Sequence, residues 1–190
     1  MSSAAQKKQE TDQQIVEKVR RGNEDAFETL FFEYYYELCS VALKVTKSPE
    51  GARDVVQDVF LRLWKNRSRW QIQISLKAYL YQAVWNQALN HREKKARLQK
   101  TREQFVKEHV PSSPQIDDIK GTNRQLIAQI WAVVKNMPER RQFVFTLHRK
   151  HGLRYKEIAH VLGLSRKTVE NHMGLALKEI REKIDYERMG

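Results

Sequence analysis

Side chains that can pair with DNA bases are gathered in a short segment near the C-terminal end of the chain. In the major groove, Arg and Lys hydrogen-bond to guanine, Asn to adenine and Glu to cytosine. The segment 166–171 contains each of these residue types. We therefore expect contacts with base edges from Arg166, Lys167, Thr168, Glu170 and Asn171.

A helix-turn-helix is the element that would hold these side chains. Gly163 can adopt the left-handed conformation that ends one helix, and Ser165 can cap the next. Apolar residues at helical spacing would face inward from the two helices, namely Ile158, Ala159, Leu162, Val169, Met173, Ala176 and Ile180. The first helix would begin with residues placed to contact phosphates, which are Arg154, Tyr155 and Lys156. An ordinary helical hairpin with a charged face remains the alternative.

A second segment has the composition of a nucleic-acid surface. No acidic residue occurs among the 34 positions between Asp58 and Glu93, whereas cations and aromatic residues alternate there. Such a mixture suits single-stranded nucleic acid, because bases stack on aromatic rings while cations follow the backbone. Trp64 and Trp85 fall among apolar helical positions, which favours the core for both. Trp70 lies in the polar stretch NRSRWQIQIS, so we expect its ring on the surface.

The helix expected over 49–66 has a polar face with one apolar residue in its middle. At about 100° per residue, Asp54, Gln57 and Asp58 fall on the face opposite the apolar residues, and Leu61 lies among them. A lone exposed Leu is ordinary on a protein surface. The centre of a protein-docking patch is an equally good interpretation.

Other classes of function are excluded by what the sequence lacks. Cys39 is the single cysteine, and there is no Gly-rich phosphate loop or nucleophile context. His148 and His151 are three residues apart, a spacing that places them only approximately on one face of a helix. We therefore expect no bound metal, no cofactor and no enzymatic activity. No apolar run could span a bilayer and the N-terminus has no apolar signal segment, so we expect a cytoplasmic protein without membrane insertion.

The net charge of +12 is concentrated in two blocks. Residues 91–107 carry seven Lys/Arg against two Asp/Glu, and residues 137–190 carry twelve against seven. Two separated basic blocks suit a polyanion that is bound in two places. A solubilising surface is the alternative.

Helical periodicity dominates the chain, and Gly and Pro are sparse, at 7 and 4 residues. We therefore expect an all-α fold of two small helical domains joined by a linker. Capping signals and periodicity together predict helices near 15–21, 23–45, 48–66, 75–97, 122–134, 138–150, 155–162 and 166–184. The predicted parts are a polar tail at 1–12, a first domain at 13–97, a linker at 98–121 and a second domain at 122–190.

Four stretches, in order along the chain, resemble the small two-domain members of the bacterial sigma-70 family, the extracytoplasmic-function (ECF) type. GNEDAFETLFFEYYYEL fits the opening helix of that family, and DVVQDVFLRLWKN is similar to its second-region docking helix. SLKAYLYQAVWNQALNH resembles the adjoining helix, which reads the minus-ten promoter element. LRYKEIAHVLGLSRKTVENHMGLALKEIREK resembles the fourth-region helix-turn-helix, which reads the minus-thirty-five element.

The resemblance implies a transcription initiation factor whose partner is core RNA polymerase. It implies that 13–97 is sigma region 2, which docks on the β′ clamp helices, and that 122–190 is region 4, which meets the β flap. It also implies binding to promoter DNA, both duplex and single-stranded, and control by an anti-sigma factor. Asp117 and Asp118 in the linker are compatible with mimicry of nucleic acid, and with a solvated linker.

Residue roles follow from the same resemblance. It assigns polymerase docking to Asp54, Gln57, Asp58 and Leu61. It places a flipped base in a pocket near the 66–74 loop, and minus-ten contacts at Arg69, Trp70, Lys77, Tyr79, Asn86 and Asn90. Gln82 and Ala83 stand where housekeeping members carry a Trp pair, which implies weaker melting of the duplex.

Two other hypotheses stay open at this point. The letters TVENH also occur in helix-turn-helix domains of response-regulator activators, although no phosphoacceptor domain is visible. A nuclease would need clustered carboxylates or metal ligands, which the sequence does not offer.

Overall fold

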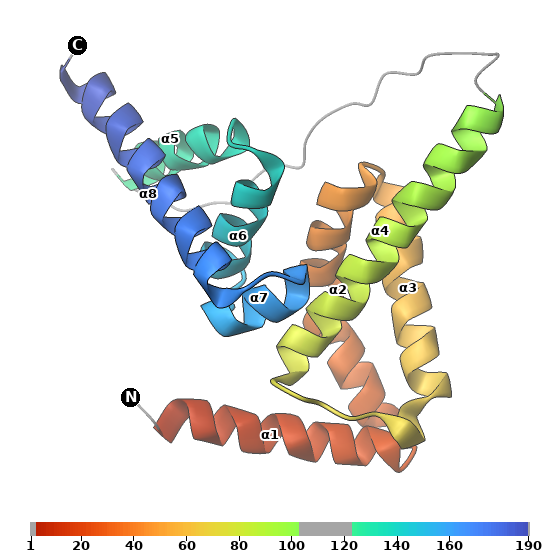
Figure 1. Cartoon of the computed structure of the whole chain (residues 1–190). Helices are drawn as coiled ribbons and strands as arrows, with labels where there is room; N and C mark the ends of the chain where they lie inside the picture. Colours follow the sequence, from red (N-terminus) through yellow and green to blue (C-terminus); the bar gives the residue numbers. More distant parts are fainter. Residues whose placement is uncertain (1–2, 103–122, 190) are drawn as a thin grey trace. The chain divides into compact units, whose positions relative to one another are not determined.

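The computed structural model describes residues 3–102 and 123–189, and this part of the chain contains helices and no strand (Figure 1). The predicted all-α fold is confirmed. The chain divides into two compact units, Met1–Val110 and Pro111–Gly190. The first unit holds α1 (Ser3–Arg20), α2 (Glu24–Thr46), α3 (Pro49–Lys65), the short 3-10 helix η1 (Arg67–Arg69) and α4 (Leu76–Arg102). The second holds α5 (Asn123–Lys135), α6 (Glu139–Arg149), α7 (Tyr155–Leu162) and α8 (Arg166–Met189).

Helix α1 is longer than predicted. It begins at Ser3, so most of the segment predicted as a polar tail is helical. Residues 3–14 read SAAQKKQETDQQ, which contains no Gly or Pro and several strong helix formers. Val16 and Val19 are buried near its C-terminal end. Apolar periodicity therefore detected only the packed end of the helix, and intrinsic propensity accounts for the rest.

Capping residues start the other helices of the first unit where the sequence predicts. Asn23, Ser48 and Ser75 each accept a hydrogen bond on the side chain from the backbone N–H three residues on, at 2.7, 3.2 and 3.1 Å. Pro49 occupies the first position of α3, where its missing N–H has no intrahelical partner to lose. These caps fix the ends of α2, α3 and α4, and with them the loop at 66–75.

The core of the first unit lies between α2, α3 and α4. Phe60 of α3 contacts two rings of α2, with centroid distances of 5.9 Å to Phe27 and 4.9 Å to Phe31. Trp64 adds a contact with Phe27 at 4.8 Å, so it belongs to this packing. Trp85 of α4 is also buried. Both Trp residues thus take part in the packing of the first unit, as the sequence favoured.

A polar cluster fastens the N-terminal half of α4 to α2. Glu37 Oε2 accepts a hydrogen bond from the Tyr81 hydroxyl at 2.5 Å and lies 3.1 Å from Lys77 Nζ. The Lys77 ammonium also lies 5.5 Å from the Tyr81 ring centroid. Because Lys77 and Tyr81 are one turn apart, a single carboxylate of α2 sets the rotation of α4 about its axis.

The second unit packs α5, α6 and α7 against α8. The predicted inner face of α8 is confirmed, since Val169, Met173, Ala176 and Ile180 are all buried. An ion pair joins α6 to α8, with Arg141 Nη1 2.6 Å from Glu179 Oε2. Position 122, where the fifth helix was predicted to begin, and the acidic pair at 117–118 lie outside the described residues.

Candidate nucleic-acid and docking surfaces

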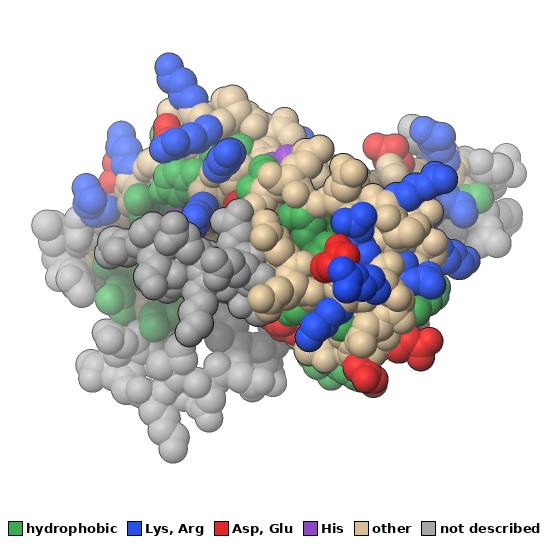
Figure 2. Space-filling view, turned by 90° about the horizontal axis from the view of Figure 1, so that it is seen from below, with side chains coloured by type: hydrophobic (Ala, Val, Ile, Leu, Met, Phe, Trp, Pro, Cys, Tyr) green, Lys and Arg blue, Asp and Glu red, His purple; other side chains and the backbone are tan. Residues whose placement is uncertain are grey.

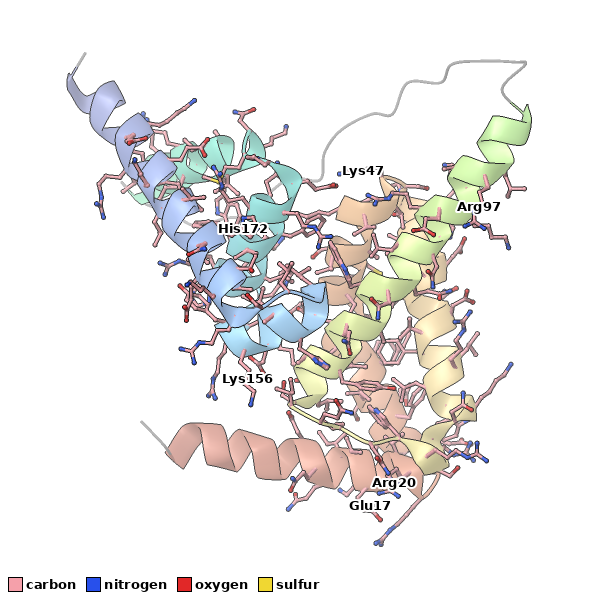
Figure 3. The ribbon with its side chains drawn as sticks, in the orientation of Figure 1. Glu17, Arg20, Lys47, Arg97, Lys156 and His172 are labelled. Carbon is pink, nitrogen blue, oxygen red and sulfur yellow. The ribbon has the colours of Figure 1, made fainter. Side chains whose placement is uncertain are left out.

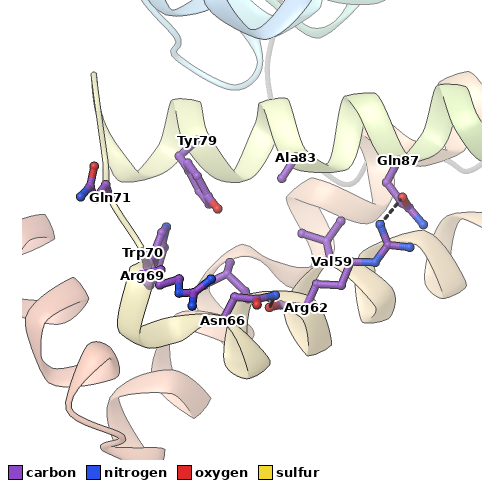
Figure 4. Close-up of a pocket in the computed structure, with 10 residues that line it drawn as sticks. Val59, Arg62, Asn66, Arg69, Trp70, Gln71, Tyr79, Ala83 and Gln87 are labelled. Atoms are coloured by element: carbon purple, nitrogen blue, oxygen red, sulfur yellow. Dashed lines mark hydrogen bonds between the residues drawn. The ribbon is translucent and has the colours of Figure 1, made fainter.

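A cavity of about 450 Å³ opens between α3, the loop that follows it and α4 (Figure 4). Its size is within the range of small-molecule sites, roughly 300–1,000 Å³. Apolar and polar side chains share its lining, which comprises Val59, Arg62, Leu63, Asn66, Arg69, Trp70, Gln71, Tyr79, Ala83 and Gln87. It lies beside the 66–74 loop, where the family resemblance implies a pocket for a flipped base.

Trp70 lies in the interior, so the prediction that its ring is exposed is wrong. Only 4% of the residue is accessible, and its ring centroid lies 5.6 Å from that of Tyr79. The turn of η1 explains the difference, because the Trp70 N–H bonds to the Arg67 carbonyl at 3.1 Å and the chain turns back there. Arg69 and Gln71, on either side, are exposed. The polar neighbours thus remain in solvent while the ring between them enters the core.

Three residues of α4 face the cavity along one stripe. Tyr79, Ala83 and Gln87 are spaced by four and lie above the opening in Figure 4. Burial raises the pKa of the Tyr79 phenol above its ordinary value.

The structure brings only some of the predicted minus-ten residues together. Arg69, Trp70 and Tyr79 share the cavity lining. Asn86 and Asn90 are exposed on α4 but lie outside that lining. Lys77 is also outside it and is held by its ion pair with Glu37.

Arg62 and Gln87 are cavity residues that the sequence reasoning missed. The Gln87 side chain accepts a hydrogen bond from Arg62 Nη1 at 3.1 Å and donates one to Asp58 Oδ2 at 3.3 Å. Because Arg only donates and a carboxylate only accepts, one orientation of the amide satisfies both. Projecting the predicted helix eight residues on from Tyr79 identifies Gln87 as a member of the same face. Gln87 therefore links the cavity to the acidic face of α3.

The polar face of α3 is fully presented to solvent. Asp54, Gln57 and Asp58 are exposed, and Leu61 among them is 56% accessible. Their spacing of three and four residues puts them on one face of the helix. The exposure that a docking patch requires is present.

Two large aromatic residues on α2 form a further exposed surface. Phe32 is 62% accessible and Tyr36, one turn later, is 79% accessible. Each lies against its neighbour in the chain, with centroid distances of 5.5 Å to Phe31 and 5.4 Å to Tyr35. Two exposed aromatic side chains one turn apart leave apolar surface in contact with solvent. The sequence reasoning overlooked it because the run FFEYYY carries rings on every face of the helix.

The predicted helix-turn-helix is present in the second unit. Gly163 ends α7 with φ of 63°, a left-handed conformation that glycine adopts without steric cost. Ser165 Oγ accepts a hydrogen bond from Thr168 N at 3.0 Å and lies 2.8 Å from Thr168 Oγ1. Thr168 is therefore part of the cap of α8 as well as a candidate for DNA contact.

The remaining base-reading candidates are exposed along the first turns of α8. Arg166 pairs with Glu170, Nε to Oε1 at 2.8 Å, one turn along the helix. Exposed pairs of this kind contribute only about 0.3–0.5 kcal/mol, so DNA can compete for either partner. Lys167 and Asn171, which share a face, are also exposed.

The start of α7 presents two cationic side chains to solvent. Arg154 is exposed, and its backbone N–H donates to Glu157 Oε2 at 2.7 Å, which closes the first turn. Lys156 points away from α7 (Figure 3). Tyr155 is half-buried, with its ring 4.9 Å from that of His148. Of the three predicted phosphate contacts, Tyr155 is thus partly engaged in packing.

The described surface is rich in cationic side chains. On the face shown in Figure 2, Lys and Arg side chains are spread widely over the described surface. Within residues 3–102 and 123–189, no helix has the length and apolar character needed to cross a membrane. In the same part of the chain, no three His, Cys, Asp or Glu residues are grouped as a metal site would require.

Family sequence models match both units. The model described as Sigma-70 region 2 matches residues 30–98, and the model described as Sigma-70, region 4 matches residues 127–180. The first match contains the cavity and the exposed face of α3. The second contains the helix-turn-helix.

Curated relatives are similar over nearly the whole chain. The RNA polymerase sigma-H factor of Pseudomonas aeruginosa is 26% identical over 184 residues, which cover 93% of each chain. The ECF RNA polymerase sigma-E factor of Escherichia coli K12 is 23% identical over 181 residues, or 92% of this chain and 94% of the relative.

Solved structures share the fold. The chain is similar to CnrH, solved in complex with the cytosolic domain of CnrY, with a TM-score of 0.61, 22% identity and coverage of 92% of this chain and 97% of CnrH. It is also similar to the sigma factor RpoE of Bartonella quintana, solved with the anti-sigma factor NepR. The TM-score there is 0.63, with 18% identity and coverage of 84% and 96%.

The matches follow one another in the order of the two units and leave no place for the activator or the nuclease considered from the sequence. Sigma factors carry out no covalent chemistry; they are the DNA-recognition subunits of RNA polymerase. The chain belongs to the sigma-70 family and is a transcription initiation factor of the extracytoplasmic-function type.

Proposed function

We propose that this sigma factor gives core RNA polymerase its choice of promoter by holding the minus-ten element in its first unit and the minus-thirty-five element in its second. The cavity between α3 and α4 is the observation that carries this proposal, because it is large enough for a base and has both polar and apolar walls. The helix-turn-helix supports the second contact.

Docking on the polymerase is assigned to the exposed face of α3. Leu61 supplies an apolar centre, and Asp54 and Asp58 surround it with negative charge. Such a face suits a cationic partner surface, and the attraction would be screened as salt rises. Gln57 adds a neutral hydrogen-bonding group to the same face.

In the first unit, the cavity receives a base that has been turned out of the minus-ten strand. Turning out a base costs a few kcal/mol of stacking, which contacts in the pocket must offset. Val59 and Leu63 provide apolar contact, and Asn66 and Arg69 provide donors. Asn86 and Asn90, exposed on α4, contact neighbouring nucleotides.

In the second unit, α8 enters the major groove. Lys167 and Asn171 reach base edges, and Arg166 exchanges its bond with Glu170 for a contact with DNA. Arg154 and Lys156 bind phosphates and set the register. Both DNA elements would be read by non-covalent contacts alone.

Two further partners follow from the relatives. Since CnrH and RpoE were solved with CnrY and NepR, we propose that an anti-sigma factor also covers this protein. Region 4 would in addition meet the β flap of polymerase. Because RNA polymerase is the machine on which it acts, the protein works in the cytoplasm.

Transcription reconstituted from purified core polymerase tests the proposal. Core with this protein should start RNA at promoters that core alone ignores, and the Asp54→Lys and Asp58→Lys double variant should abolish co-elution with core and all initiation. A matched Glu24→Lys and Asp25→Lys variant, at the exposed start of α2, should initiate normally. Normal initiation by the α3 variant, or none by the wild type with fully occupied core, would contradict the proposal.

A further inference from the structure

The indole N–H of Trp70 is a buried donor without an acceptor. Trp70 is 4% accessible, and its Nε1 atom has no hydrogen-bond partner among the described residues. Buried Trp side chains usually find a partner for this group, because an unmade hydrogen bond leaves the cost of desolvation uncompensated. An orphaned donor of this kind calls for a specific explanation.

The place of this donor supplies one. Trp70 lines the cavity between α3 and α4, and its indole nitrogen points toward α4 on the side where Tyr79 lies (Figure 4). The two ring centroids are 5.6 Å apart, so Tyr79 packs beside the indole. The nitrogen is sealed from solvent in this structure, so contact with a ligand requires side chains of the cavity lining to move.

Three polar side chains of the cavity, Arg62, Asn66 and Gln87, already bond to protein groups. Gln87 and Arg62 bond to each other, and Asn66 Nδ2 donates to the Arg62 carbonyl at 2.9 Å. A ligand that used the bonded atoms would compete with these existing bonds. A bond to the Trp70 N–H would instead satisfy a group that has none.

We propose that Trp70 is a specificity-determining residue of this sigma factor, and that its indole N–H donates to an acceptor atom of the base held in the cavity. The inference rests on the proposed minus-ten function and adds the chemical basis on which one base is preferred in the cavity. The indole N–H can only donate a hydrogen bond. It therefore favours a base that places a carbonyl oxygen or an unprotonated ring nitrogen opposite it, and disfavours a base that places an exocyclic amine there.

The test compares Trp70→Phe with Trp64→Phe, a half-buried control in the packing of α2 against α3. Holoenzyme is bound to forked promoter fragments with a single-stranded minus-ten region, in which each base is varied in turn. Trp70→Phe should lose about three- to tenfold in affinity for the preferred base at one position and little for the other bases there. Trp64→Phe should keep the wild-type preference at every position.

A second arm uses a base analogue that lacks the acceptor atom. Because it changes the DNA and not the protein, its result in the wild type does not depend on how well the variants fold. At the responding position, the wild type should lose the same factor with the analogue, whereas Trp70→Phe should bind analogue and natural base equally. Unchanged base preference in Trp70→Phe, or a uniform loss at every position as expected if the N–H binds only a trapped water, would overturn the inference. The proposed function would survive either result; it fails instead if wild-type holoenzyme shows no base preference anywhere in the minus-ten strand.

Discussion

Glu37 of α2 contacts two side chains of α4 through one carboxylate. It accepts the Tyr81 hydroxyl at 2.5 Å and pairs with Lys77 at 3.1 Å. Burial and the neighbouring carboxylate both raise the pKa of the Tyr81 phenol above its usual 10.0. The phenol therefore stays protonated in the folded state at pH values where an unfolded chain would lose that proton.

Replacement of Tyr81 by Phe should lower the free energy of unfolding by about 1–2 kcal/mol, because the bond to Glu37 is removed. The raised pKa also predicts a pH dependence. Its stabilising effect is complete below pH 10.0 and declines as the pH rises above it, since only the unfolded state then releases the proton. Urea titrations from pH 8 to 11 should show this decline in the wild type and a shallower one in the variant. Equal slopes would contradict the assignment.

Asn171 and Lys156 should give contrasting results in the second unit. Asn171→Ala should cost about 1–3 kcal/mol on the preferred minus-thirty-five sequence and relax the choice at one base pair. Lys156→Ala should weaken all sequences to a similar extent and reduce the salt dependence of binding by about one unit of slope. Holoenzyme affinities measured over a range of salt concentrations and over single base changes distinguish the two. If Lys156→Ala changed the base preference, its assignment to phosphate would be wrong.

Single residues also mark the limit of what the sequence could predict. The exposure of Asp54, Asp58 and Leu61 followed from helical periodicity, because each is opposite a buried stripe. The burial of Trp70 could not be predicted in this way, because it depends on a turn at η1 that brings the ring beneath Tyr79. Gln87 was missed for a related reason: its role requires knowing which face of α4 lies across from Asp58.

At the scale of helices, Gly51 sets how closely α3 approaches α4. A Cβ at this position would lie 2.9 Å from His91 Nε2, which is closer than real Cβ contacts. The neighbour is the end of a side chain, so it can move. Helix geometry at Gly51 is ordinary, and Ala would otherwise be favoured there by about 1 kcal/mol.

Gly51→Ala should therefore raise the free energy of unfolding by less than that amount in the wild-type background. In a His91→Ala background it should raise it by the full amount. The coupling, measured as a double-mutant cycle by urea unfolding, should be about 0.5–1 kcal/mol. Additive effects would mean that His91 does not control the spacing of the two helices. Gly174→Ala provides the control, because Gly174 is an exposed residue of α8 with open space around it. Its effect on the free energy of unfolding should not depend on His91.

The C-terminal turns of α4 carry the first basic block of the sequence. They project beyond the ends of α2 and α3 in Figure 1, and the side chains from Arg92 to Leu98 are exposed. Figure 3 shows Arg97 extending from this part of the helix into solvent. Like charges at these spacings repel, and a nearby polyanion would relieve that repulsion.

Changing Lys94 and Lys95 to Gln should therefore weaken promoter binding and lower the salt slope by about two units, one for each phosphate that is no longer neutralised. Unfolding should be unaffected or slightly more difficult. Lys178 and Lys183, changed together to Gln, supply a control of equal charge on an exposed part of α8. Equal salt slopes for the wild type and the α4 variant would show that this block only solubilises the chain.

Helix boundaries were predictable wherever a cap or a glycine ends the pattern, as at Asn23, Ser48, Gly163 and Ser165. Helix α1 was not, because its first turns have no apolar stripe for periodicity to detect. Local hydrogen-bonding signals thus carried more information about boundaries than hydrophobic pattern did.

At the scale of the whole molecule, the protein consists of two units, to which we assign separate DNA elements. Each has its own core, and the matches to region 2 and region 4 fall one in each. Two tethered contacts on one DNA act at a high effective concentration when their spacing fits, and lose that advantage when it does not. On this assignment we expect each unit alone to bind promoter DNA weakly and the pair to bind it selectively.

This arrangement predicts how substitutions in the two units combine. On a promoter of optimal spacing, Asn171→Ala in α8 and Asn90→Ala in α4 should have additive free-energy effects on holoenzyme binding, because they share no partner. When the spacer is changed by about five base pairs, half a turn of B-DNA, α8 faces the wrong side of the duplex. The effect of Asn171→Ala should then vanish while that of Asn90→Ala persists. Affinity measurements on the two promoters with all four proteins test this, and a persistent Asn171 effect on the altered spacer would mean that the tether, rather than the geometry of the bound polymerase, determines where the second unit binds.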